Sequence, residues 1–244
     1  MRPRERRHAV NREQLEDQQW DPIAVFRRIA RLARLDEGVF AEVRDDKAQT
    51  LPALAVVVGA VLLAAVGGWL FLVIEYDGLS GGRIFVREFL LGGVFAVLLW
   101  GVWGLAAELM LTQVYGVQVS RISMFRCLGY AAAPAAIMVL MLLTPIALAV
   151  GLVAIVAWWH LSGRAIAVAV PGASEAQATM ANLFGFAVFA VVLAVLGNQA
   201  GMAPGVFVQA GGVSEYVERF NISINTGMLP GGATDLVALA GGLR

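Results

Sequence analysis

The chain of 244 residues is 59% hydrophobic and 15% charged, with a mean hydropathy of +0.74. Globular proteins are about 45–50% apolar and about 25% charged, and a soluble core of this size could not bury the excess, which excludes a soluble domain. The 18 basic and 18 acidic residues cancel, which excludes a nucleic-acid binder that works through bulk positive charge. With one cysteine, Cys127, and two histidines, we expect no disulfide, metal or cofactor.

The charges are concentrated at the start of the chain. Residues 1–50 hold 11 of the 18 Lys and Arg and 10 of the 18 Asp and Glu. The first 20 residues lack the apolar run of a secretory signal. The sequence therefore predicts three parts: a cytoplasmic N-terminal segment at 1–50, a membrane domain at 51–197 and a Gly-rich extracytoplasmic tail at 198–244.

Residues 22–35 have the periodicity of an amphipathic helix, for which Asp21 is the predicted N-cap and Pro22 suits the first turn. At 100° per residue the apolar side chains fall within roughly 120° of arc: Val25, Phe26, Ile29, Leu32 and Ala33. Opposite them lie Arg27, Arg28, Arg31 and Arg34. This pattern is typical of a helix at the membrane interface that binds anionic lipids. A helix that packs on a soluble partner is the alternative interpretation.

Residues 36–50 predict a second short helix. Phe40 and Val43 would share one face of this helix, and the acidic pair Asp45–Asp46 would end it.

Charge-free runs define the membrane spans, because about 20 apolar residues cross the hydrocarbon. The run at 127–163 is too long for one span, and Thr144–Pro145 divides it. Pro134 and Pro145 are expected to bend or end their helices. The sequence predicts an all-α bundle of five transmembrane helices at 51–74, 88–111, 127–143, 146–168 and 180–196.

The positive-inside rule sets the expected orientation. Arg121 and Arg126 between spans two and three, and Arg164 near the end of span four, share a side with the N-terminal arginines. Arg83 and Arg87 lie on the other side and weaken the bias. We expect a multi-pass protein of the plasma membrane with a cytoplasmic N-terminus and an extracytoplasmic C-terminus.

Three stretches carry a resemblance to a known family. They are residues 36–52 before span one, the block FRCLGYAAAP at 125–134 with Gly129, Tyr130 and Pro134, and the Trp158-bearing region 153–186. In these features the chain resembles the Ypt-interacting protein (Yip) family of five-span membrane proteins, and its bacterial and archaeal members most. The resemblance covers about residues 36–197. It implies a Yip domain, and eukaryotic relatives are linked to Rab GTPases and vesicle traffic.

Glu108 near the end of span two is the most informative polar residue, because a carboxylate there is costly unless it is paired or close to water. Arg164 is expected at a similar depth, so we predict a Glu108–Arg164 pair, with His160 one turn from the arginine. A proton or ion relay is one interpretation. A pair that locks two helices, or two side chains that extend to the lipid headgroups, is favoured over a relay, because the middle of each span has no further ionisable groups.

Two further patterns bear on function. Small residues at close spacing, such as Gly67–Gly68, Gly101–Gly104 and Gly129–Ala133, predict close helix contacts. Nucleotide-binding, nucleophile-elbow and zinc-protease motifs are missing, so no enzyme activity is predicted. The most favoured function is a scaffold, assembly or partner-recruiting component that contacts other membrane proteins. The alternative is a small-solute or ion transporter or channel that uses Glu108 and Arg164.

Overall fold

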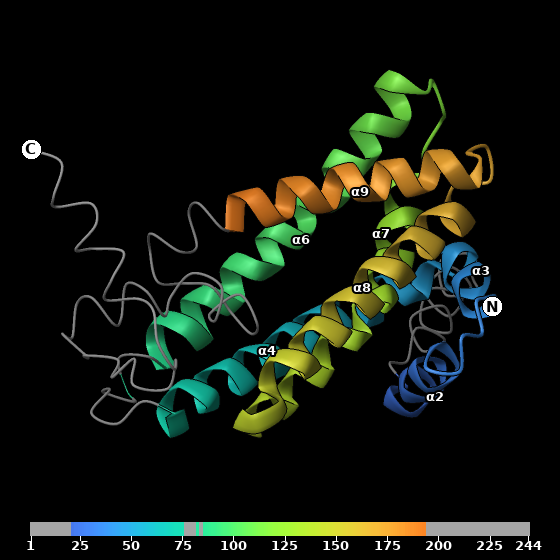
Figure 1. The fold of residues 1–244 in the computed structure, drawn as a ribbon. Helices are drawn as coiled ribbons and strands as arrows, with labels where there is room; N and C mark the ends of the chain where they lie inside the picture. The colour runs from blue at the N-terminus through green and yellow to red at the C-terminus, as the bar shows by residue number, and fades with distance from the viewer. Residues whose placement is uncertain (1–20, 76–81, 83–84, 194–244) are drawn as a thin grey trace, which may run out of the picture.

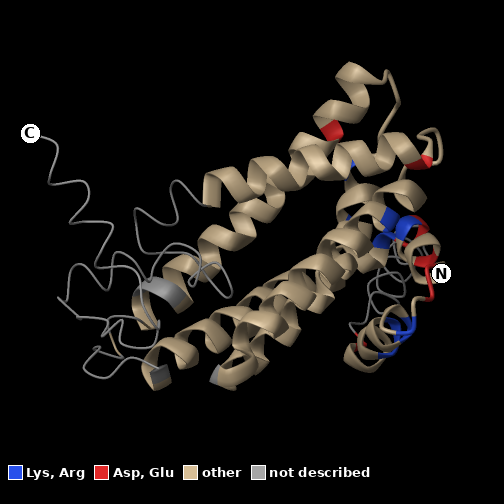
Figure 2. Ribbon diagram, in the orientation of Figure 1, with Lys and Arg blue, Asp and Glu red and all other residues tan. Residues whose placement is uncertain are grey.

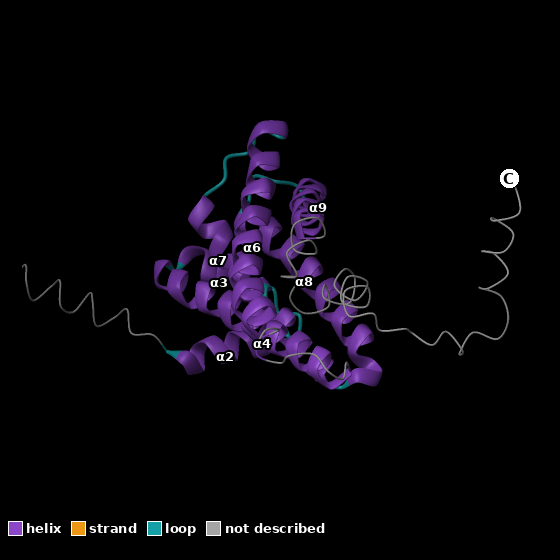
Figure 3. Ribbon diagram, turned by 90° about the vertical axis from the view of Figure 1, so that its left-hand side faces the viewer, coloured by secondary structure: helices purple, strands orange, loops and turns teal. Residues whose placement is uncertain are grey.

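The computed structural model describes residues 21–75, 82 and 85–193, and all regular structure in them is helical (Figures 1 and 3). Five helical stretches are long and apolar enough to cross a bilayer: Lys47–Ile74, Phe89–Val114, Arg121–Leu142, Ala147–Ala169 and Glu175–Val192. The predicted all-α class with five candidate spans is confirmed. Residues 1–20 and the tail at 198–244 lie outside the described residues, so the predictions for them are not tested.

Each span is built from one helix or from consecutive helices of different pitch. Spans one, four and five are the α-helices α4 (Thr50–Glu75), α8 (Ala147–Ala169) and α9 (Glu175–Val192). Span two runs from the π-helical η2 (Phe85–Leu91) through α6 (Gly92–Leu109) to the π-helical η3 (Met110–Val114). Span three is α7 (Arg121–Ala131) followed by the 3₁₀-helical η4 (Ala133–Leu142), and η5 (Thr144–Ile146) leads to α8.

Prolines mark the changes of pitch in span three, as the sequence predicts. Pro134 lies in the first turn of η4, directly after α7 ends at Ala131. Because proline has no N–H, it cannot continue the α-helical hydrogen-bond ladder. Pro145 lies in η5 and separates the third span from the fourth.

Two helix starts differ from the sequence prediction. Span three begins at Arg121 rather than residue 127, so Arg126 lies within a helix instead of a loop. Span five begins at Glu175 rather than residue 180. There the Ser174 side chain accepts from the Gln177 backbone and the Gln177 side chain accepts from the Ser174 backbone, which forms a capping box. The positions of charged residues alone therefore did not predict where these two helices begin.

The spans pack in a bundle in which α4 lies most extensively along η4, and α6 lies along α9 (Figure 1). Some predicted glycine contacts are present. A Cβ on Gly67 would collide with the Met138 carbonyl oxygen, and a Cβ on Gly129 would lie 2.7 Å from the Ala53 carbonyl oxygen. Gly59 and Gly101 meet nothing within 4 Å. Only some of the glycines therefore mark a helix–helix contact.

The outward faces of the spans carry large exposed apolar side chains, as a lipid environment requires. They include Leu62, Leu63, Leu98, Leu105, Leu148, Leu152, Val153, Val156, Leu183 and Val191.

Residues 21–49 form a group of short helices at one end of the bundle, here called the cap (Figure 1). It contains α2 (Pro22–Leu32), α3 (Gly38–Asp45) and the 3₁₀ turn η1 (Lys47–Gln49). Asp21 caps α2 by accepting from the Ile23 backbone, as predicted. The helix ends three residues earlier than predicted, and Leu35 follows with a left-handed φ of 60°.

The short helix expected within 36–50 is α3, and its apolar face is fully buried against the bundle. Val39, Phe40 and Val43 are each 0% exposed. The prediction that Phe40 and Val43 share a buried face is confirmed, and Asp46 follows the helix as its C-cap.

Candidate functional site

The charged residues whose side chains the structure describes gather at the end of the bundle that bears the cap (Figure 2). This end, here called the charged end, holds the start of α4, the end of span two, the start of α7, the end of α8 and the start of α9. Every Lys and Arg whose side chain the structure describes belongs to the cap or to these helix ends: Arg27, Arg28, Arg31, Arg34, Arg44, Lys47, Arg121, Arg126 and Arg164.

The predicted Glu108–Arg164 pair does not form, because each residue has other partners. Arg121 binds Glu108 with both ends of its guanidinium group, at 2.7 Å from Nε to Oε2 and 2.9 Å from Nη2 to Oε1. Glu108 and Arg121 lie on either side of the short connection between spans two and three, which brings their side chains close together. This pair joins consecutive helices and replaces the expected link between spans two and four.

Arg164 instead connects the cap, α8 and α9. Its Nε and Nη2 donate to the two carboxylate oxygens of Glu37 at 2.6 and 2.7 Å, and its Nη1 donates to Glu175 at 3.0 Å. We call these three residues the Arg164 clasp. Hydrogen bonds from Arg164 hold the pKa of Glu37 below its ordinary value. His160 is exposed, and it lines a cavity of about 160 Å³ with Arg164 and Glu175.

Polar contacts at the buried face of α3 attach the cap a second time. Arg126 donates to the Val43 carbonyl oxygen at 3.2 Å, and Cys127 Sγ lies 3.3 Å from the Phe40 carbonyl oxygen. Arg44 donates to the carbonyl oxygen of Val168 at 3.1 Å. The bonds from Arg126 and Arg44 satisfy backbone carbonyls in the last turns of α3 and α8, which have no partner inside their own helices.

Gln49 is the polar centre between the cap and span three. The Tyr130 hydroxyl donates to its Oε1 at 2.8 Å, and Arg28 Nη1 donates to the same oxygen at 3.2 Å. Gln49 in turn donates to Asp46 at 2.8 Å. The sequence did not predict the role of Gln49, because a single glutamine beside a span has no pattern that indicates its partners. Tyr130 was singled out only as part of the block at 125–134.

The four arginines of α2 divide into two pairs. Arg31 binds Asp36 at 2.7 Å and Glu42 at 2.8 Å, and Arg28 binds Gln49. The hydrogen bond from Arg31 lowers the pKa of Asp36. Arg27 and Arg34 are exposed. Two of the four predicted lipid-binding arginines are therefore engaged inside the cap.

The apolar residues of α2 divide in the same way. Val25 and Leu32 are buried, and Ile29 packs partly buried against the core. Ile23 and Phe26 are 62% and 70% exposed. The outward face of α2 thus combines exposed apolar and basic side chains.

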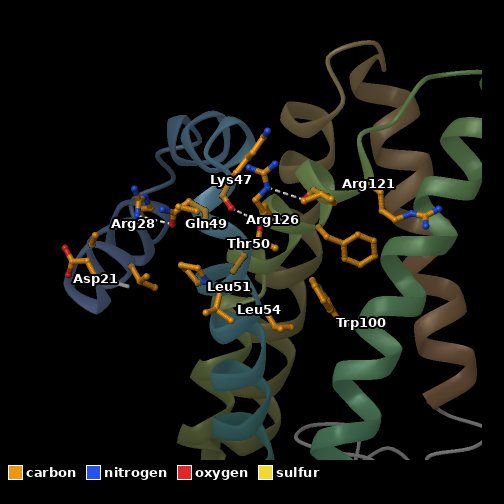
Figure 4. Close-up of a pocket in the computed structure, with 17 residues that line it drawn as sticks. Asp21, Arg28, Lys47, Gln49, Thr50, Leu51, Leu54, Trp100, Arg121 and Arg126 are labelled. Carbon is orange, nitrogen blue, oxygen red and sulfur yellow. Dashed lines mark hydrogen bonds between the residues drawn. The ribbon is translucent and has the colours of Figure 1, made fainter. Parts of the chain in front are cut away.

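A cavity of about 690 Å³ lies between α2, the starts of α4 and α7, and the middle of α6 at Trp100 (Figure 4). We call it the cap groove. Charged or polar residues line one part, and apolar residues line the other. Its lining includes Arg28, Lys47, Gln49, Arg126, Leu51, Leu54, Trp100, Ile122 and Phe125.

The middle of the bundle is apolar and aromatic, with one buried amide. Asn182 accepts from Trp103 Nε1 at 3.2 Å and donates to the Trp159 carbonyl oxygen at 2.8 Å, which links α6, α8 and α9. Trp103 also packs on Trp158 and Phe189, with ring centroids 5.3 and 5.6 Å apart. In the described part of the chain no group of three or more His, Cys, Asp or Glu is placed to hold a metal ion.

Comparison of the chain with models of protein families, with curated proteins and with solved structures finds no match. The resemblance to the Yip family gains no support from these comparisons and stays a prediction.

Proposed function

We propose that this protein is a non-catalytic membrane scaffold whose cap holds a binding platform for a partner at the cytoplasmic surface. The attachment of the cap is the observation that carries the proposal. The Arg164 clasp and the buried face of α3 hold the cap on the bundle, while Phe26, Arg27 and Arg34 of α2 stay exposed. A helix with one face locked to the bundle and the other left open has a defined orientation for recognition.

The exposed face of α2 forms this platform, and in the proposal it lies at the membrane interface. Ile23 and Phe26 would enter the headgroup region, and Arg27 and Arg34 would meet anionic lipids or an acidic partner. The arginine-rich charged end supports a cytoplasmic cap in this proposal, which places the protein in the plasma membrane. The tail at 198–244 would be the second contact surface, on the extracytoplasmic side, because five spans place the two termini on opposite sides of the membrane.

Transport through the bundle is the second candidate function that the sequence raised. It needs polar groups along the whole path. Among the spans, the charged residues whose side chains the structure describes lie at the charged end, and Glu108, Arg164 and Glu175 are paired there. Liposome flux measurements with Glu108→Gln distinguish the two functions. The scaffold proposal expects no solute flux from either protein, and a flux that the substitution abolishes would favour transport.

Site-specific photocrosslinking of the full chain in native membranes tests the scaffold. A photoreactive residue at position 34 is exposed on the cap, and one at position 148 is exposed on the outer face of α8. We expect a discrete protein adduct at position 34 and only lipid adducts at position 148. Lipid adducts alone at both positions would contradict partner recruitment.

A pair of variants shows whether the attached cap matters for that adduct. Arg164→Met removes the clasp, and Arg121→Met removes another bidentate ion pair, one outside the cap. The proposal expects the position-34 adduct to be lost with Arg164→Met and kept with Arg121→Met. Equal loss with both variants would show that general stability, rather than the cap, controls the contact.

A further inference from the structure

The cap groove has the layout of a site for an amphiphile. Figure 4 shows the side chains of Arg28 and Arg126 at one level of the groove, and those of Leu54 and Trp100 at another. Its volume of about 690 Å³ falls within the range of roughly 300–1,000 Å³ that is usual for ligand sites. The groove therefore offers polar and apolar walls to one bound molecule.

The polar wall carries positive charge that the described carboxylates do not fully neutralise. Arg126 is 5% exposed and donates to Val43 and Ile122 carbonyl oxygens and to the Ser123 hydroxyl, which are all neutral acceptors. Asp45 accepts hydrogen bonds from Arg44, and Arg126 interacts with it only at longer range, through electrostatic attraction. Buried charges are normally paired with an opposite charge, so Arg126 favours an anion near the groove.

The other charged residues of the lining leave this excess in place. Glu42 forms only a long ion pair with Arg28, at 3.8 Å from Nε, because its shorter contact is with Arg31 at 2.8 Å. Glu108 neutralises Arg121, and Asp21 caps α2. Lys47 extends from the rim of the groove (Figure 4). A bound anion would therefore meet Arg28, Arg126 and Lys47 with little competition.

Two buried hydrogen-bond donors of the lining have no acceptor. They are Nε of Arg28 and the indole Nε1 of Trp100, which is 8% exposed. Buried donors of this kind are rare in folded proteins, because leaving them unpaired is unfavourable. They come from different walls of the groove, and phosphate and ester oxygens are suitable acceptors for both.

The apolar wall continues onto the lipid-facing surface of the protein. Leu51, Leu54 and Ile122 line the groove and are 61%, 45% and 62% exposed. An acyl chain that starts in the groove can therefore extend along α4 into the bilayer. A free phosphate or an acidic peptide would leave this wall uncovered.

We propose that the cap groove binds one anionic phospholipid, with its phosphate beside Arg28 and Arg126, an ester oxygen near Trp100 Nε1 and an acyl chain along Leu54. The bound lipid would fill the space between α2 and span one. This inference concerns a specific lipid and does not depend on the proposed partner platform.

Native mass spectrometry of the full chain in mild detergent, titrated with phosphatidylglycerol or phosphatidylcholine, tests the proposal. We expect one retained phosphatidylglycerol, with an affinity about tenfold higher than that of phosphatidylcholine. Excess glycerol phosphate should not displace it, because the acyl chain supplies part of the binding. Displacement by glycerol phosphate would point to a free-phosphate site, and equal retention of the two lipids would overturn the proposal.

Neighbouring arginines of α2 provide a matched pair of variants. Arg28 lines the groove, whereas Arg27 is exposed and does not line it. Arg28→Gln should weaken phosphatidylglycerol retention about tenfold, and Arg27→Gln less than about twofold, although both remove one charge. Equal weakening would show that bulk electrostatic attraction explains the retention, which would overturn the site.

Variants of the apolar wall provide a second test of lipid retention, which does not depend on whether Arg28→Gln folds. Trp100→Phe removes the unpaired donor and keeps a ring, and Leu54→Trp fills the groove from an exposed position. Both should weaken retention, whereas Trp159→Phe, which removes an unpaired indole donor outside the groove, should not. Unchanged retention with Trp100→Phe and Leu54→Trp would contradict the proposed position of the lipid.

Discussion

At the scale of single residues, two glycines of α4, Gly59 and Gly67, have opposite surroundings. Gly67 faces the backbone of Met138 in η4, and Gly59 faces open space. Small residues at helix contacts let backbones approach closely. Sequence spacing marked Gly67 as a contact residue, and the structure identifies the atoms that it meets.

We predict that Gly67→Ala destabilises the bundle and that Gly59→Ala does not. The added methyl group at position 67 would force η4 away from α4, at a cost of about 1–3 kcal/mol. At position 59 it meets nothing within 4 Å. Thermal unfolding of the two variants in detergent measures the difference, and equal melting temperatures would contradict the packing of α4 on η4.

Asn182 is the second residue for which the structure makes a sharp prediction. Its amide accepts from Trp103 and donates to the Trp159 carbonyl, so Asn182→Leu leaves a buried indole N–H unpaired. A double-mutant cycle with Trp103→Phe should give a coupling energy of about 0.5–1.5 kcal/mol, as for other hydrogen bonds between membrane helices. Strict additivity of the two unfolding free energies would show that this bond does not stabilise the bundle.

At the scale of elements, the attachment of α3 decides how the cap sits. Its apolar face was predictable from spacing, because Phe40 and Val43 are three residues apart on one side of a helix. Its polar attachment was not predictable, because Glu37 and Arg164 are 127 residues apart. Only the packing of α3 against α8 brings these two side chains together.

We predict that acid loosens the cap. The pKa of Glu37 is lowered by its hydrogen bonds to Arg164, so the ionised pair stabilises the attached cap fully above the ordinary value of 4.5. This stabilisation is lost as the pH falls through the lowered pKa. Asp36 and Asp45, whose pKa values are lowered by Arg31 and Arg44, act with the same sign.

Hydrogen exchange of the α3 amides between about pH 5 and pH 3, corrected for the intrinsic rate, measures this loosening. At neutral pH, Glu37→Gln should speed exchange of the α3 amides and lower their free energy of protection by about 1 kcal/mol or less. The effect is small because the ion pair is about one third exposed. The variant should also reduce the pH dependence. An unchanged pH profile would show that Glu37 does not control the attachment.

Helix boundaries at the charged end were the least predictable part of the elements. Arg121 and Arg126 suggested a loop, but both lie in α7, where Glu108 and the Val43 carbonyl provide acceptors. Their partners come from other segments of the chain, so the sequence around 121–126 did not reveal them. The start of α9 did carry a local signal, the capping box at Ser174 and Gln177.

At the scale of the whole molecule, the spans alternate in direction, so the cap and the connection between spans four and five lie at the same end. The connection between spans one and two lies at the other end, and Gly82 is exposed in it. Cys127 is 0% exposed, which makes the natural protein a suitable background for introduced thiols.

We predict the orientation from thiol labelling in intact cells. Ala41→Cys in the cap and Ala176→Cys at the start of α9 replace exposed residues and should react with a membrane-impermeant maleimide only after lysis. Gly82→Cys should react from outside. Labelling of all three in intact cells, or the reverse pattern, would contradict a cytoplasmic cap.

The sequence by itself determined that most of the chain suits a lipid environment, and it determined the number of candidate spans. Both follow because apolar runs of about 20 residues have the length that crosses a bilayer. It also determined the buried face of α3, because helical spacing is local. Only the tertiary structure decided which carboxylate meets which arginine, which glycine meets a backbone and where the cap groove opens. These properties depend on residues far apart in the chain, such as Glu37 with Arg164, and local spacing carries no information about such distances.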